Sequence, residues 1–154
     1  MRFSSRSLRS GSALLACAGL MAVAACDPDM PAAKPSTLSV SGAWARGSDS
    51  GATTAVYFVL ANSAAIADTI KATGSDAADS VGLHISMQHS GMMHMSELTA
   101  LPVPANDSVS FRPLGAHVML TGLRRPLAAG DSVDVWLDFV SGERLVVRAG
   151  VRTP

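Results

Sequence analysis

The sequence has little cysteine and little charge. Its 154 residues include two cysteines, 16% charged residues and a formal net charge of zero. Cys17 and Cys26 both lie near the N-terminus, so everything after them has no disulfide and no thiolate to offer a metal. With 48% hydrophobic residues, the chain is long enough for one domain with its own core, and a second domain is not expected.

Residues 1–25 are typical of an export signal. Their apolar run is too short for a comfortable membrane span, so they are not expected to form a transmembrane helix. Three arginines precede the apolar stretch "GSALLACAGLMAVAA". This stretch ends in "VAAC", small residues directly before Cys26, as in a bacterial lipoprotein signal that is cleaved before a cysteine carrying lipid. We expect Cys26 to be the lipidated first residue. Cleavage before Cys17, or a secretory signal cut after Ala25 without lipid, are the alternatives.

The processed chain would have nine basic and twelve acidic residues, a net charge of −3, which argues against nucleic acid as a partner. Residues 26–37 contain three prolines and little apolar content, and this composition predicts an extended tether. We therefore expect the protein in the periplasm, anchored to the membrane as a lipoprotein.

Residues 38–152 consist of short apolar runs separated by Gly, Ser, Asp, Asn and Pro, a pattern typical of an antiparallel sandwich or barrel. No window has helical periodicity with caps. Pro102 and Pro104 exclude a central strand where they lie, because proline lacks the ladder donor. The expected strands are 38–45, 55–62, 68–74, 80–86, 93–98, 108–113, 117–123, 132–139 and 144–151.

Imidazole and thioether groups are concentrated in one region. All four histidines and five of the eight methionines lie within residues 84–119. Soft thioether sulfur favours copper(I), whereas calcium and magnesium prefer oxygen. A thioether has no proton to lose and forms no disulfide, which suits an oxidising compartment.

Alternation along the expected strand 117–123 makes two of these residues a preformed ligand pair. His117 and Met119 point to one face of the strand, and Val118 and Leu120 point to the other.

The segment after the glycine at position 91 alternates in the same way. Met93 and Met95 share one face, Met92 and His94 share the other, and one of these faces is expected to be core. Methionine commonly fills gaps in cores, so Met87, Met92 and Met93, taken singly, are expected to be core residues.

The intervals between four of these residues resemble a known motif. His84, Met95, His117 and Met119 are separated by ten, twenty-one and one residues, a pattern similar to the copper motif of the periplasmic copper chaperone family PCu(A)C. Four longer stretches also resemble sequences of this family: "SVSGAWAR", "LHISM", "GAHVMLTGLRRPLAAGDSV" and "VDVWLDFVSGERLVVR". The resemblance covers about residues 38 to 152.

This resemblance implies a single cupredoxin-like antiparallel β-sandwich in which those four residues are direct ligands of one copper(I) ion. It also implies that Gly91 gives a turn with positive φ that brings Met95 back beside His84. Four protein ligands leave no open position for a substrate, so a carrier fits better than a catalyst. His89 and His94 lie outside the pattern and are expected either to be simple exposed loop residues or to form at most a weaker second site favouring copper(II).

The resemblance further implies a monomeric metallochaperone that delivers copper to the copper centre of a respiratory terminal oxidase, directly or through a Sco-type thioredoxin-like protein. Two other functions stay open: copper sequestration or tolerance, and a metal-free interaction module of the cell envelope. An enzyme is not expected, because the sequence has no G-x-S-x-G or H-E-x-x-H motif and no cysteine nucleophile in the folded part.

Overall fold

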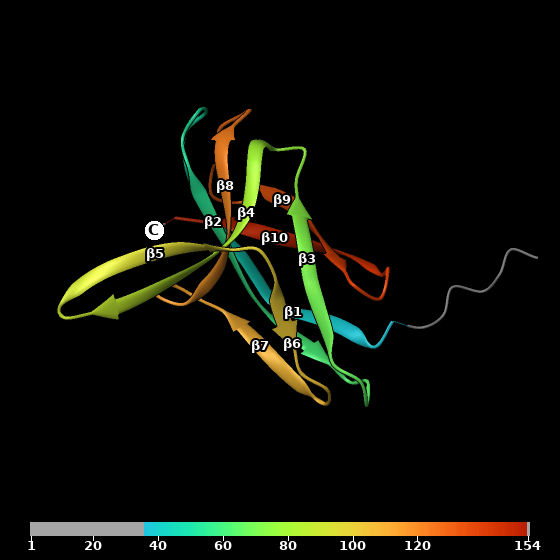
Figure 1. Cartoon of the computed structure of the whole chain (residues 1–154). Coiled ribbons are helices and arrows are strands. Elements are labelled where there is room, and N and C mark those ends of the chain that lie inside the picture. The colour runs from blue at the N-terminus through green and yellow to red at the C-terminus, as the bar shows by residue number, and fades with distance from the viewer. Residues whose placement is uncertain (1–35, 154) are drawn as a thin grey trace, which may run out of the picture. The chain divides into compact units, whose positions relative to one another are not determined.

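The computed structural model describes residues 36–153, and in this range it contains β-strands and no helix (Figure 1). The strands are β1 (Leu38–Arg46), β2 (Thr54–Asn62), β3 (Asp68–Gly74), β4 (Ala78–His89), β5 (Met92–Leu98), β6 (Leu101–Val103), β7 (Asp107–Phe111), β8 (Ala116–Leu123), β9 (Ser132–Phe139) and β10 (Arg144–Arg152). Within the described residues, no helix is long and apolar enough to cross a bilayer. The predicted signal segment, the tether up to residue 35 and Cys26 lie outside these residues.

The strands are hydrogen-bonded in the order β5-β4-β8-β7-β2-β1-β10-β9-β3-β6. Most neighbours are antiparallel, as predicted, but β1 pairs with β10 and β7 pairs with β8 in parallel. β3 also packs beside β4, so the sheet folds over on itself into a sandwich.

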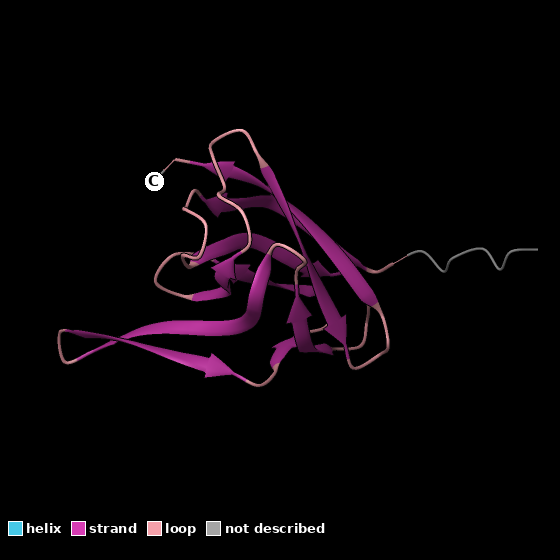
Figure 2. Cartoon of the chain, turned by 90° about the horizontal axis from the view of Figure 1, so that it is seen from above, coloured by secondary structure: helices cyan, strands magenta, loops and turns pink. Residues whose placement is uncertain are grey.

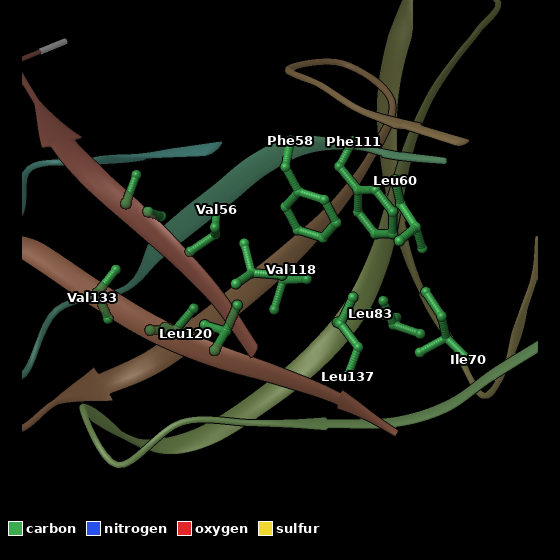
Figure 3. Close-up of a cluster of buried hydrophobic side chains, with 14 of the residues drawn as sticks. Val56, Phe58, Leu60, Ile70, Leu83, Phe111, Val118, Leu120, Val133 and Leu137 are labelled. Carbon is green, nitrogen blue, oxygen red and sulfur yellow. The ribbon is translucent and has the colours of Figure 1, made fainter. Parts of the chain in front are cut away.

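The core lies between the two layers (Figure 3). The rings of Phe58 in β2 and Phe111 in β7 stack with centroids 4.1 Å apart. Val118 and Leu120 of β8 are fully buried beside them, as the predicted alternation requires. Residues 36–153 belong to one compact unit with its own core, so this domain is expected to fold without the N-terminal segment.

All nine predicted strands are present, with bounds shifted by a few residues. The short strand β6 was not predicted, because proline argued against a strand there. β6 is the last strand in the order, and Pro102 pairs with Thr69 of β3 on one side only. A proline is tolerated at such an edge because no neighbour needs its missing donor.

The β4–β5 hairpin extends away from the sandwich as a two-stranded ribbon (Figures 1 and 2). The expectation that one face of this segment is core is wrong, and so is the core role for its single methionines. Met87, Met92 and Met93 are 52%, 61% and 49% exposed. The reason is that no second layer covers the ribbon beyond the body of the domain.

Candidate metal centre

Two histidines face one another across neighbouring strands. His84 in β4 lies directly opposite His117 in β8. Their ring centroids are 6.0 Å apart, and the ring planes are inclined by 23°. Because a bond between a metal and an imidazole nitrogen is about 2 Å long, rings at this separation are within reach of one ion.

The two methionines of the predicted set lie on the same face as this pair. Met119 is two residues beyond His117 in β8, and side chains two apart in a strand share a face. Met95 in β5 lies opposite Ser86, which is two residues beyond His84 in β4. The register therefore brings all four predicted residues to one face of β5, β4 and β8.

The turn of the hairpin returns Met95 to this face. Ser90 and Gly91 have φ values of 51° and 79°, as the two central residues of a type I′ turn require. The predicted positive φ at Gly91 is confirmed.

A depression of about 280 Å³ opens on this face. Its lining residues are Arg46, Thr53, Thr54, Ala55, Tyr57, Ser86, Met95, Pro113, Leu114, His117 and Met119. Three of the four predicted residues therefore line one hollow, and the fourth, His84, stacks beside His117. A larger depression of about 810 Å³ elsewhere on the described domain is lined by neither histidine nor methionine.

The four side chains range from the core to the solvent. His117 is 4% exposed, His84 and Met119 are half-buried, and Met95 is 56% exposed. A metal bound here would contact the buried His117 on the side of the sandwich. It would be accessible to solvent on the side of Met95 and the hairpin.

A backbone hydrogen bond orients the ring of His117. Its Nδ1 lies 3.0 Å from the carbonyl oxygen of Gly115. A carbonyl only accepts, so Nδ1 carries the proton and donates it. Nε2 is left with a free lone pair, the arrangement that backbone carbonyls commonly impose on metal-binding histidines.

Nδ1 of His84 is the one buried side-chain nitrogen or oxygen in the described part of the chain without a hydrogen-bond partner. Leaving a buried polar atom unpaired costs about 1–3 kcal/mol, and a bound ligand would remove that cost. Gly82 leaves room for this ring, since a Cβ there would lie 3.1 Å from Cε1 of His84 and 3.3 Å from Oε1 of Glu97. His84 therefore has the unmet bonding capacity expected of a ligand-binding residue.

The donor set fits a soft metal ion. Among residues 36–153, no group of three or more His, Cys, Asp or Glu side chains is arranged to hold a metal. Two imidazoles on this face therefore need the methionine sulfurs to complete a coordination shell. Two nitrogens with two thioethers favour copper(I) over zinc, calcium or magnesium.

Aromatic rings flank the site on the side away from the hairpin. The centroid of Tyr57 in β2 is 6.2 Å from that of His117, and Trp44 in β1 is 4.5 Å from Tyr57. The guanidinium of Arg152 lies 5.6 Å from the Trp44 centroid. No local sequence pattern predicts this row, because its members come from four different strands, β8, β2, β1 and β10.

Met87, Met92 and His94 of the hairpin do not lie on this face, whereas Met93, two residues from Met95, does. His94 lies opposite Met87, and position 89 lies opposite Met92, on the other side of the ribbon from Met95. The histidines and methionines of residues 84–95 are therefore divided between two faces.

Residues 38–151 match the family model described as "LpqE-like: Putative lipoprotein LpqE-like". The chain belongs to the LpqE-like family. A protein of Leifsonia xyli subsp. xyli (strain CTCB07), named "Putative lipoprotein Lxx21020", is 33% identical over 123 residues, which are 79% of this LpqE-like chain and 74% of that protein.

Solved structures similar to this LpqE-like domain include copper-binding domains. The copper-bound PCuAC domain from PmoF2 is 23% identical, with a TM-score of 0.64, over 77% of this chain and 94% of that one. The solution structure of CuI-DR1885 from Deinococcus radiodurans is 29% identical, with a TM-score of 0.57, over 73% of this chain and 78% of that one.

These similarities confirm the predicted relationship to the PCu(A)C copper chaperones and the predicted all-β, cupredoxin-like sandwich. The LpqE-like chain shares the fold of these PCuAC domains.

Proposed function

We propose that this LpqE-like protein binds one copper(I) ion through His84, Met95, His117 and Met119 and carries it in the cell envelope. The observation that carries the proposal is the register of β5, β4 and β8, which gathers two imidazoles and two thioethers on one face. The copper(I) form of the 29% identical DR1885 supports this choice of metal and oxidation state.

The unequal burial of the ligands suits a carrier. His117 is held by a hydrogen bond to the carbonyl oxygen of Gly115, which needs no bound metal. Met95 is exposed on the ribbon, so a partner's ligand can replace its sulfur first and draw the ion away. Transfer then proceeds by exchange of one ligand at a time, and copper need not be released into water.

The proposed recipient is the copper centre of a respiratory terminal oxidase, reached directly or through a Sco-type thioredoxin-like protein, and the carrier is a monomer. Sequestration or tolerance is the alternative role for the same site. A deletion strain separates them: a carrier is needed under copper starvation, and a tolerance protein is needed under copper excess. A metal-free module would keep its function when all four ligands are replaced.

The central test replaces Met119 by leucine, which preserves volume and apolarity. Met119→Leu is expected to lower copper(I) affinity at least ten-fold, or about 1.4 kcal/mol, because it removes one of two soft donors. The measurement is anaerobic competition with a copper(I) chelator, using residues 34–154. Met93→Leu is the matched control, because Met93 is a nearby methionine outside the proposed set. Unchanged affinity in Met119→Leu would falsify its ligand role, and a large loss of apo stability would identify Met119 as a core residue.

We propose that the protein is held at the membrane by lipid on Cys26, after removal of residues 1–25, with residues 26–37 as a tether and the domain in the periplasm. The family and the relative named as a lipoprotein support this. Cys26→Ala should leave the chain unprocessed or release it from membranes. Recovery of the parent protein in the soluble periplasmic fraction, with an unmodified N-terminus by mass spectrometry, contradicts the anchor.

We also propose that His89 and His94 bind copper(II) weakly, because imidazole serves that harder ion well. Replacing both by alanine should leave copper(I) binding at the four-ligand site nearly intact, since neither residue belongs to the proposed ligand set.

A further inference from the structure

The ribbon has two faces, and both display exposed methionine side chains. One face carries Met95, the ribbon's contribution to the site described above. On the reverse face Met87 lies directly opposite His94, and His89 lies directly opposite Met92 in the backbone register. The two cross-strand pairs are adjacent, because positions two apart in a strand share a face.

Packing does not account for the methionines of this reverse face. Met87 and Met92 are 52% and 61% exposed, and His94 is also exposed. Large apolar side chains that gather on an uncovered surface usually mark a binding site. The ribbon projects beyond the sandwich, so nothing else in the described domain covers this face (Figure 2).

The spacing of the two pairs suits a single ion. Directly opposite residues of an antiparallel pair have Cβ atoms about 4.5–5.5 Å apart, and positions two apart in a strand are separated by about 7 Å. Methionine and histidine side chains are long enough to converge from the corners of such a patch. Met87, Met92 and His94 supply two thioethers and one imidazole, a donor set that favours copper(I).

We propose that Met87, Met92 and His94 form a second copper(I) site on the reverse face of the ribbon. This site goes beyond the weak copper(II) binding proposed above for the histidines. The thioethers of Met87 and Met92 are soft donors, and they favour copper(I). It shares no residue with the four-ligand site. Its failure therefore leaves the proposed carrier function intact.

The test is anaerobic titration of residues 34–154 with copper(I), followed by ¹³C-methyl methionine NMR. The parent domain is expected to bind two equivalents, with the Met87 and Met92 methyl signals shifting as one of them binds. Met87→Leu, Met92→Leu and His94→Gln in one chain should bind one equivalent. Met93→Leu, on the other face, should still bind two.

A second variant separates the two sites. Met95→Leu with Met119→Leu weakens the first site and should leave the Met87 and Met92 shifts in place. A parent stoichiometry of one, or two equivalents in the triple variant, overturns the second site.

An aerobic titration with copper(II) should show weak binding in the parent that is lost in the triple variant. Shifts of the Met87 and Met92 methyl signals on addition of a protein partner, with none on addition of copper(I), would identify the face as a docking surface and also overturn the proposal.

Discussion

At the scale of single residues, His117 and Met95 have opposite structural roles in the same site. His117 is almost fully buried, donates through Nδ1 to Gly115 and lies beside the ring of Tyr57. Met95 is exposed on the projecting part of the ribbon, away from Leu83, which the same hairpin buries in the core. One residue is therefore part of the fold as well as the site, and the other belongs to the site alone.

His117→Ala should therefore destabilise the apo domain by about 1–3 kcal/mol, whereas Met95→Leu should change its stability by less than about 0.5 kcal/mol. Both should weaken copper(I) binding by at least ten-fold. Urea unfolding of the apo forms, paired with anaerobic chelator competition, measures the two effects separately. Equal apo stability of the two variants would contradict the distinction drawn from burial.

At the scale of elements, β9 and β10 are joined by a ladder of ion pairs on their outer face. Arg148 lies opposite Asp134 and Arg144 lies opposite Asp138, each with two short hydrogen bonds. The hydrogen bond from Arg148 holds the pKa of Asp134 below its ordinary value of 3.8, although partial burial acts in the opposite direction. Arg144 lowers the pKa of Asp138 in the same way.

A lowered folded-state pKa gives this ladder a defined pH dependence. The ionised carboxylate stabilises the fold above the unfolded pKa of about 4, and the contribution is lost as pH falls through the lower folded value. Between about pH 4 and pH 2 the parent should lose stability more steeply than Asp134→Asn. Asp49→Asn is the control, because Asp49 makes no salt bridge within the described domain. Parallel acid-unfolding curves for parent and Asp134→Asn would contradict the ladder's contribution.

At the scale of the whole molecule, the proposed site connects the projecting ribbon to the sandwich. Its ligands come from β4, β5 and β8, so one ion would link the exposed hairpin to a strand that carries core residues. Any ligand that binds the folded state alone raises its stability by mass action.

Copper(I) should therefore raise the unfolding temperature, with about 2.7 kcal/mol of added stability at a free concentration 100 times the dissociation constant. Anaerobic calorimetry on residues 34–154 measures the shift. The shift should be much smaller in the Met95→Leu, Met119→Leu variant, whose apo form should unfold near the parent temperature. An equal shift in that variant would show that the stabilising ion binds elsewhere.

Several features followed from local sequence because their causes are local. The alternation of His117 and Met119 with Val118 and Leu120 follows from strand geometry, and the structure has both core residues fully buried. The glycine at position 91 predicted its turn, because few other residues adopt a positive φ easily. The intervals between the four proposed ligands are also a local property of the sequence, and they predicted the relationship to the PCu(A)C family.

Other features depended on which strands meet and on what covers them, and no local pattern contains that information. The alternation of Met92, Met93 and Met95 is the same whether the ribbon is covered or projects into solvent, so a core role was predicted where the side chains are exposed. The opposition of His84 and His117 depends on a register between strands that are distant in the sequence. The division of the histidines and methionines between two faces likewise follows from pairing across the hairpin, because a shift of one residue in that register would exchange the faces.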